Sequence, residues 1–327
     1  MSAELAIAQL LIGQSPAMVR LRALIAKVAR TSLPILIEGP TGSGKELVAQ
    51  ALHVASGRSG PFVPFNVCAI AETMFEDALF GHVRGAFTGA LSDSPGYLVQ
   101  ADKGTAFFDE ISGLSLMAQT KLLRAIETRE FRPVGGRCDV RSDFRVVAAT
   151  NRSLEELQEQ SAFREDLRHR FGKMILKVPP LAERPEDVMS LAHHFLELAS
   201  DGCPGFTVRA VARLERHDWP GNVRELRSVV ESAAALVSGS NRIDGDDIAE
   251  LLVSSQRVSV RDDFELRRTL QVLTEVGGNV VLAAEALGVN KTTIYRRLRR
   301  ARVTRPAAAI MPPDIERVSD SPPAIAT

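Results

Sequence analysis

The sequence predicts an α/β domain built on a parallel sheet, followed by a smaller all-helical subdomain and a small all-helical C-terminal domain. In the first 180 residues, short apolar runs typical of strands alternate with helical stretches. From about residue 181 to 252 the strand signals disappear while the helical pattern continues. Because strands that alternate with helices are joined by right-handed crossovers, we expect a parallel sheet between two layers of helices.

Changes in composition along the 327 residues predict six parts. They are an N-terminal tail (1–11), the α/β subdomain (12–180), the helical subdomain (181–252), a polar linker (253–262), a helical domain (263–305), and a C-terminal tail (306–327). The last part is rich in Pro and Ala and is predicted to be disordered.

Composition excludes several classes of protein. The sequence is 45% hydrophobic with a formal net charge of zero, so the chain as a whole is not a polyelectrolyte binder. No apolar run approaches the ~20 residues of a membrane-spanning helix, and no basic cluster precedes an apolar stretch at the N-terminus. We therefore expect a cytoplasmic protein without a membrane partner. Three cysteines lack the spacing of a zinc site and are expected to be free thiols: Cys68, Cys138 and Cys203.

A glycine-rich loop follows the apolar run Leu33–Glu38 and precedes the helical stretch Lys45–Ala55. This strand–loop–helix context is that of a P-loop, in which backbone N–H groups and a helix N-terminus bind phosphate oxygens. Lys45 would reach the β- and γ-phosphates, whereas Glu46 stands where a Ser or Thr ligand to Mg²⁺ is usual. An ordinary glycine-rich turn is the alternative. The loop consists of Gly39, Pro40, Thr41, Gly42, Ser43, Gly44 and Lys45.

Polar residues follow two further predicted strands. Asp109 and Glu110 end the apolar run Thr105–Phe108, about 65 residues after the P-loop. Asp109 is placed to hold Mg²⁺ and Glu110 to act as the general base that polarises the attacking water. Thr150 and Asn151 end the run Phe144–Ala149, and ligands bind at such strand ends in α/β sheets. They either sense the γ-phosphate or orient the water, or they form only a polar strand end.

A hexapeptide between these two motifs identifies a family. Gly85, Ala86, Phe87, Thr88, Gly89 and Ala90 reproduce the GAFTGA signature, and Glu76–His82 and Gly96–Leu98 around it also agree. From about Ile12 to Leu252 the chain resembles the sigma-54-dependent activators, also called bacterial enhancer-binding proteins. The resemblance implies a P-loop AAA+ ATPase domain with a helical lid subdomain over 181–252. It also implies that the GAFTGA loop contacts sigma-54, supported by a second hairpin near Pro133–Phe144.

The resemblance also implies roles for single residues at the nucleotide. An acidic residue commonly follows the P-loop lysine in this family, as Glu46 does here. Asn66, two residues before Cys68, matches the residue that holds the catalytic glutamate, here Glu110. Arg224 lies in Trp219–Leu226, which matches the second sensor, and would face the nucleotide.

Arginine fingers are implied by the stretch Phe163–Leu167. Arg164 and Arg170 fall at the two finger positions, whereas Arg168 and His169 stand where relatives have aromatic residues. For Arg168 we expect a solvated helix face. An arginine supplied by a neighbouring subunit can contribute ~10³–10⁵ in rate, so hydrolysis would require a ring, which in this family is a hexamer.

The C-terminal domain predicts a helix-turn-helix formed by Thr269–Val276, Val280–Leu287 and Lys291–Arg302, with Gly288 ending the middle helix. Seven basic residues and no acidic ones lie between Lys291 and Arg305, which indicates a polyanion partner. The pattern resembles a Fis-type domain. Its last helix would enter the major groove, with contacts from Lys291, Thr292, Thr293, Tyr295, Arg296 and Arg297.

These features together predict an ATP- and Mg²⁺-dependent transcription activator that binds upstream, enhancer-like DNA and converts closed complexes of the sigma-54 RNA polymerase holoenzyme to open ones. We expect a homo-hexamer with a resting dimer, or a hetero-oligomer with a related chain. About a dozen residues precede Ile12, so no N-terminal regulatory domain is expected and control would come from a separate, trans-acting protein or from expression level. The alternatives are an ATP-independent DNA-binding regulator and another AAA+ remodeller.

Overall fold

The computed structural model describes residues 3–159, 163–199, 205–237, 242–276 and 278–300. The chain divides into two compact units, Met1–Ala249 and Glu250–Thr327. The predicted C-terminal tail over 306–327 lies outside the described residues. Among the helices of the described part, none combines the length and the apolar character that a membrane crossing requires.

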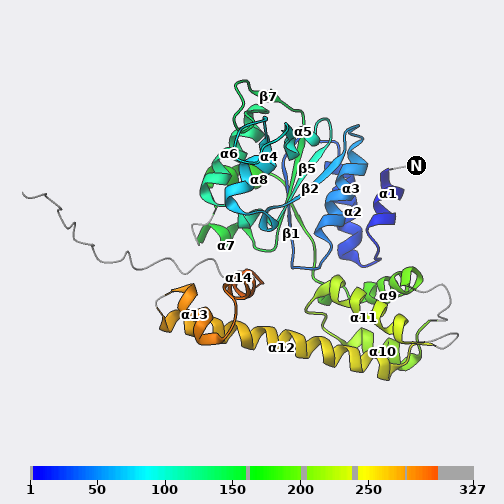
Figure 1. Cartoon of the computed structure of the whole chain (residues 1–327). Coiled ribbons are helices and arrows are strands. Elements are labelled where there is room, and N and C mark those ends of the chain that lie inside the picture. Colours follow the sequence, from blue (N-terminus) through cyan, green and yellow to red (C-terminus); the bar gives the residue numbers. More distant parts are fainter. Residues whose placement is uncertain (1–2, 160–162, 200–204, 238–241, 277, 301–327) are drawn as a thin grey trace, which may run out of the picture. The chain divides into compact units, whose positions relative to one another are not determined.

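A parallel sheet of five strands forms the centre of the first unit, in the order β2-β5-β8-β1-β9. This confirms the predicted α/β class (Figure 1). The strands are β1 (Ile35–Glu38), β2 (Phe62–Asn66), β5 (Thr105–Asp109), β8 (Arg145–Thr150) and β9 (Ile175–Lys177). Two of them, β2 and β9, were not predicted: Pro64 interrupts the first and the second is only three residues long.

Helices cover both faces of this sheet (Figure 1). Because side chains alternate along a strand, Ile35 and Ile37 pack into one apolar cluster and Leu36 into the other. The first cluster is covered by α1 (Ala3–Leu10), α2 (Pro16–Val28) and α3 (Lys45–Ser56). The second is covered by α4 (Phe75–Phe80), α5 (Tyr97–Gln100), α6 (Leu116–Thr128), α7 (Leu154–Glu159) and α8 (Glu165–Phe171).

The first helix corrects one expectation. A tail was predicted over residues 1–11, but α1 occupies most of this segment and its side chains join the core. Ile7 is 1% exposed and Leu11 is 4% exposed. Burial of two large aliphatic side chains, worth ~1.5–3 kcal/mol each, explains why these residues are helical and packed.

Short elements complete the first unit. Two small antiparallel hairpins pair β3 (Gly81–His82) with β4 (Ser94–Pro95), and β6 (Glu130–Phe131) with β7 (Val140–Arg141). The second of these is the hairpin expected near Pro133–Phe144. Single 3-10 turns lie at η1 (Val67–Ala69), η2 (Glu72–Met74), η3 (Ile111–Gly113) and η4 (Leu181–Glu183).

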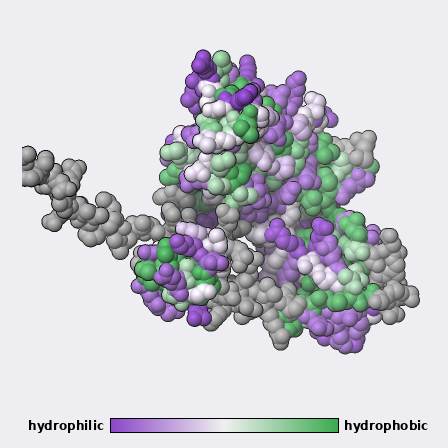
Figure 2. Space-filling view, in the orientation of Figure 1, coloured by the Kyte–Doolittle hydropathy of each residue, from purple (hydrophilic) through white to green (hydrophobic). Residues whose placement is uncertain are grey.

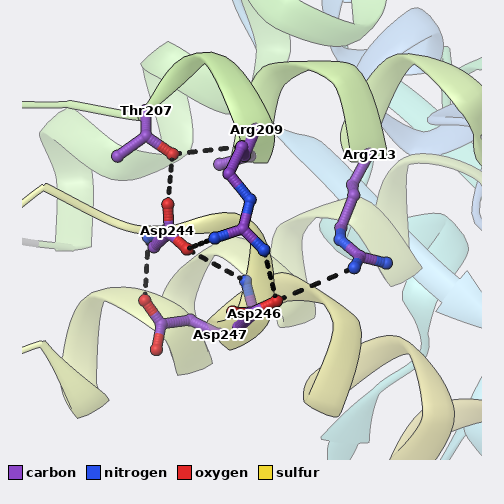
Figure 3. A network of polar contacts seen from close by, with 7 residues as sticks. Thr207, Arg209, Arg213, Asp244, Asp246 and Asp247 are labelled. Atoms are coloured by element: carbon purple, nitrogen blue, oxygen red, sulfur yellow. Dashed lines mark hydrogen bonds and ion pairs between the residues drawn. The ribbon is translucent and has the colours of Figure 1, made fainter.

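The lid subdomain is helical, as predicted, and consists of α9 (Glu186–Ala199), α10 (Val208–Arg216), α11 (Asn222–Leu236) and the beginning of α12. A polar network joins the N-termini of α10 and α12 (Figure 3). The Thr207 hydroxyl donates to Asp244 Oδ1 at 2.7 Å and caps α10. Arg209 bridges Asp244 and Asp246 at 3.2 and 2.9 Å.

Helix α12 runs from Gly245 to Glu275 and corrects a second expectation. The sequence predicted a polar linker over 253–262, but this stretch is helical. It contains no proline or glycine, so no residue in it breaks the backbone hydrogen bonding of a helix. In the second unit, α12 is followed by α13 (Val280–Leu287) and α14 (Lys291–Arg300), which pack around Leu273, Ala283 and Ile294.

Candidate nucleotide, loop and DNA sites

The glycine-rich loop joins β1 to α3, as the P-loop prediction requires. Gly42 and Gly44 have φ of 78° and 102°, a region that glycine enters without a Cβ clash. Lys45 is 7% exposed, and its Nζ donates to the carbonyl oxygens of Gly39 at 2.9 Å and Pro40 at 3.1 Å. The Ser43 Oγ is buried and has no hydrogen-bond partner among the described residues. The loop therefore surrounds an ammonium group at the N-terminus of a helix, which is an arrangement suited to an anion.

The carboxyl ends of β2 and β5 bring Asn66 and Asp109 together, because these residues are direct register partners. The Asn66 Oδ1 accepts a hydrogen bond from the Cys68 N–H at 3.0 Å. Glu110 has a φ of 58°, and its N–H donates to Asp109 Oδ1 at 3.1 Å. A left-handed glutamate is uncommon, and such strain concentrates at functional sites.

Strand β8 places Thr150 and Asn151 beside the P-loop. Thr150 pairs in register with Glu38, and its carbonyl accepts from the Gly39 N–H at 3.2 Å. Thr150 is fully buried, and its hydroxyl accepts from the Arg152 N–H at 3.1 Å. The Asn151 Oδ1, in contrast, is buried without a partner in the described part of the chain. Of the two strand-end residues, Asn151 is therefore the one whose side-chain oxygen is available to accept a hydrogen bond from a ligand or a water.

A cavity of about 700 Å³ adjoins the P-loop. Its size falls in the ~300–1,000 Å³ range of small-molecule sites. Residues of the P-loop, of the end of β8, of helix α2 and of the segment after β9 surround it, including Gly39, Pro40, Asn151, Arg20, Leu24 and Pro180.

The lid contacts the backbone of the P-loop. The backbone N–H of Arg224 donates to the Gly42 carbonyl at 3.2 Å. An added Cβ at Gly42 would lie 2.4 Å from the Gly221 carbonyl oxygen, so this contact excludes any larger residue. Arg224 lies in the first turn of α11, and its backbone adjoins the loop; that its side chain faces the nucleotide stays a prediction. Two further lid residues, Asn222 and Arg184, also contact the loop and were missed from the sequence.

The two expected finger arginines lie at opposite ends of α8. Arg164 precedes the helix, and its guanidinium donates to Asp166 at 2.7 Å while its N–H donates to Gln119 Oε1 at 2.8 Å. The Asp166 carboxylate holds the pKa of Arg164 above its usual value, and Arg164 lowers the pKa of Asp166. Arg170 is half-buried in the last turn, with an Nε that lacks a partner among the described groups.

The GAFTGA loop lies between β3 and β4 and forms a tight turn. Gly85 and Gly89 have φ of 80° and 105°, and the Gly85 N–H donates to the Ala90 carbonyl at 2.9 Å. Phe87 is 40% exposed and Thr88 is also exposed. The ring of Phe87 packs edge-on against His82, with centroids 5.0 Å apart.

The second hairpin supports this loop at its base. The Val83 N–H donates to the Val134 carbonyl at 3.1 Å. If Gly135 carried a Cβ, that atom would lie only 2.7 Å from the Cβ of Ala86. The two turns are therefore packed against each other. Hydrophilic residues gather over hairpin β6–β7 at the top of the view in Figure 2.

The C-terminal unit has the predicted helix-turn-helix form. Gly288 ends α13 with a φ of 64°, and the Asn279 side chain caps its beginning. On α14, Lys291, Thr292 and Tyr295 are exposed and Thr293 is half-buried, while Ile294 and Leu298 face the core. The side chains of Arg296 and Arg297 lie outside the described ones.

Comparisons with known families agree with this arrangement. The profile of the Sigma-54 interaction domain matches residues 11–177. The AAA+ ATPase lid domain matches residues 182–263, and the Fis family of bacterial regulatory proteins matches residues 260–300.

Individual relatives lead to the same family. The transcriptional regulatory protein ZraR of Escherichia coli is 41% identical over 89% of this chain and 68% of its own length. The regulator NtrC of a Bradyrhizobium species is 38% identical over 88% of this chain and 69% of its own length. The crystal structure of NtrX from Brucella abortus in complex with ATP is 34% identical, with a TM-score of 0.66 over 89% of this chain and 68% of that one. The chain belongs to the family of sigma-54-interacting AAA+ transcriptional regulators that carry a Fis-type DNA-binding domain.

Proposed function

We propose that this chain hydrolyses ATP and uses the energy to convert closed complexes of sigma-54 RNA polymerase to open ones. The observation that carries the proposal is the convergence of the P-loop with Asp109 and Glu110 at the carboxyl ends of one parallel sheet. In open α/β sheets this edge is where ligands bind. The position of the GAFTGA loop, with exposed Phe87 and Thr88, adds a contact surface for sigma-54.

The residues at the site fit an Mg²⁺–ATP complex. Mg²⁺ is usually held by one or two carboxylates together with substrate phosphates, where it neutralises phosphate charge. Asp109 supplies such a carboxylate. The Ser43 hydroxyl, which has no partner among the described residues, offers a further oxygen in place of the Ser or Thr hydroxyl that is usual at the position of Glu46. Lys45 would leave its two carbonyl partners for the β- and γ-phosphates.

Hydrolysis needs a base and a positioned water. Glu110 directly follows Asp109 and would accept the proton of the attacking water. Asn66 is the register neighbour of Asp109, which supports its proposed role in holding Glu110. Asn151 has an unfulfilled amide oxygen next to the P-loop and would orient the water or sense the γ-phosphate.

Assembly would complete the site. Arg164 is 40% exposed in its side chain and paired with its own Asp166, so it can be drawn toward a neighbouring subunit without leaving the core. We propose that Arg164 and Arg170 act in trans on a neighbour's γ-phosphate, in a hexamer built from a resting dimer or with a related chain. A trans-acting protein would be a further partner of this assembly, and its site of action would be the cytoplasm.

DNA binding would be the task of α14. Its exposed Lys291, Thr292 and Tyr295 are placed for base and phosphate contacts in a major groove, and Thr293 together with Arg296 and Arg297 would extend this surface. Binding to upstream DNA would raise the local concentration of the ATPase near the polymerase.

Steady-state ATP hydrolysis by the full chain tests the motor assignment. Lys45→Ala should abolish turnover because it removes the charge that binds the β- and γ-phosphates. Lys27→Ala, a loss of an exposed lysine on α2, is the matched control and should hydrolyse ATP like the wild type. Wild-type turnover by Lys45→Ala would instead favour an ATP-independent DNA-binding regulator.

A further inference from the structure

Three consecutive carbonyl groups of the P-loop accept hydrogen bonds from the lid. The Asn222 Nδ2 donates to the Thr41 carbonyl at 3.1 Å, and the Arg224 N–H donates to the Gly42 carbonyl at 3.2 Å. The Arg184 Nη2 donates to the Ser43 carbonyl at 3.0 Å. Two of these donors are side chains that have no part in the proposed hydrolysis.

The direction of these carbonyls fixes the direction of the N–H groups that follow them. In a planar trans peptide, the C=O of one residue and the N–H of the next point in opposite directions. Carbonyls that face the lid therefore turn the N–H groups of Gly42, Ser43 and Gly44 away from it. The Ser43 N–H does point across the loop, to the Pro40 carbonyl at 3.3 Å. This is the side on which Lys45 lies, since its Nζ shares the same Pro40 acceptor.

Asn222 is held firmly in its own position. It is 4% exposed, and its Oδ1 accepts from the Leu181 N–H at 2.8 Å while the Nδ2 reaches the loop. Its φ is 55°, a conformation in which Asn is several-fold enriched over most residues. The amide oxygen is thus bonded within the lid, while the Nδ2 donates to the Thr41 carbonyl of the P-loop and, at 3.4 Å, to the Pro220 carbonyl.

Arg184 is also buried, at 2% exposure, and follows η4. Burial lowers the pKa of its guanidinium, and the nearby Asp187 opposes this shift. Asp187 itself binds the N-terminal segment, because its carboxylate accepts from the Ser15 N–H at 2.8 Å and the Ser15 hydroxyl at 2.7 Å. A buried cation is costly without compensating hydrogen bonds, and the Ser43 carbonyl of the P-loop is an acceptor that the structure provides for the Arg184 guanidinium.

We propose that Asn222 and Arg184 are positioning residues for the nucleotide: they hold the P-loop carbonyls toward the lid and so turn its N–H groups toward the phosphates. A movement of the lid would then change the affinity of the loop for phosphate directly, in addition to any contact that the Arg224 side chain makes. The inference rests on the proposed binding of ATP by this loop.

The dissociation constant of a fluorescent ADP, measured on the full chain, tests the role of Asn222. Asn222→Gly removes the amide but keeps a residue that tolerates positive φ. It should weaken ADP binding about tenfold, the result of losing a buried hydrogen bond, and should raise KM for ATP more than it lowers kcat. Thr207→Ala is the control, because it removes a capping hydrogen bond within the lid and should leave ADP affinity unchanged.

Substitutions of Arg184 provide a second test. Arg184→Met removes the donor at similar length, while Arg184→Lys keeps a charged donor and should recover part of the lost ADP affinity. Melting temperatures of all variants identify any that are unfolded. Folded Asn222→Gly or Arg184→Met protein that binds ADP as well as the Thr207→Ala control would overturn the inference. A wild-type chain that binds no ADP would overturn the proposed function itself, and this inference with it.

Discussion

Asn66 and Asp109 end neighbouring strands of the sheet as direct register partners. Glu110 follows Asp109 in a left-handed conformation, so three side chains of the proposed hydrolytic centre are fixed by two adjacent strand ends. The backbone N–H of Glu110 is tied to the Asp109 carboxylate at 3.1 Å.

We expect Glu110→Gln to lower kcat for ATP hydrolysis ~10²–10⁴-fold, the usual contribution of a general base, and to leave nucleotide binding intact. The amide keeps the shape of the side chain but cannot accept the proton. Turnover and fluorescent-ADP affinity measured on the same sample check this. Glu127→Gln, an exposed carboxylate on α6, is the control. Normal turnover by Glu110→Gln would remove Glu110 from the base role.

Mixing two inactive variants tests the finger arginines. Arg164→Ala should lose hydrolysis because its neighbour's site lacks the guanidinium, a loss of ~10³–10⁵ in rate for a true finger. Lys45→Ala should lose it because its own site cannot hold the nucleotide. A mixture should regain activity, since Lys45→Ala subunits supply Arg164 to intact sites. Arg168→Ala should remain active alone. No recovery in a mixture that assembles would contradict action in trans.

The exposed tip of the GAFTGA loop gives a separable defect. Thr88→Ala should keep ATP hydrolysis close to the wild-type level and block open-complex formation, because the substitution removes a hydroxyl at the contact surface and nothing at the nucleotide. Permanganate reactivity of the melted promoter measures the open complex. Ser92→Ala, two residues beyond the motif and also exposed, should behave normally. Open complexes formed at the normal rate by Thr88→Ala would exclude this function of the loop.

Glu38 gives a pH-dependent prediction. It is 7% exposed at the end of β1, and burial raises the pKa of its carboxyl above the usual 4.5. Between the unfolded and the folded pKa, the folded state binds more protons, so the free energy of unfolding falls as pH rises through this window. Glu38→Gln cannot ionise, and its Oε1 can still accept from the Leu154 N–H.

As the pH rises from 4 to 8, the free energy of unfolding of the wild type should therefore fall relative to that of Glu38→Gln. Urea unfolding at both pH values measures it. If the wild type instead became more stable relative to Glu38→Gln as the pH rises, the folded state would favour the ionised Glu38 carboxylate, and the prediction would be wrong.

DNA binding by α14 should depend strongly on salt. Lys291→Ala should weaken binding to all sequences by a similar factor and reduce the slope of log K against log salt by ~0.9, as expected for one lost phosphate contact. Fluorescence anisotropy with a DNA duplex at several salt concentrations measures this. Gln271→Ala, an exposed change on α12, should retain the slope. An unchanged slope for Lys291→Ala would place the phosphate contacts elsewhere.

Sequence patterns identified the P-loop, the Asp109–Glu110 pair and the helices of the lid, because each depends on local chemistry or on periodicity. Strands β2 and β9 escaped because Pro64 and a length of three residues hide their patterns. The helical stretch 253–262 has a polar, aperiodic sequence that resembles a linker, and nothing in it stops a helix that begins at Gly245.

The hydrogen bonds from Asn222 and Arg184 to the P-loop could not be predicted, since they join residues 181 and 141 positions apart. Such contacts depend on how the lid packs on the sheet. No local pattern in a single sequence records that packing, although Asn222 lies inside the stretch Trp219–Leu226 that was singled out for Arg224.

In vitro transcription with purified sigma-54 RNA polymerase decides whether nucleotide cleavage drives promoter opening. The chain is added to preformed closed complexes with ATP, with a non-hydrolysable ATP analogue, or as Lys45→Ala with ATP. We expect transcripts only for the wild type with ATP. Equal transcript yield with the analogue or with Lys45→Ala would show that binding alone activates the polymerase, and the motor mechanism would be wrong.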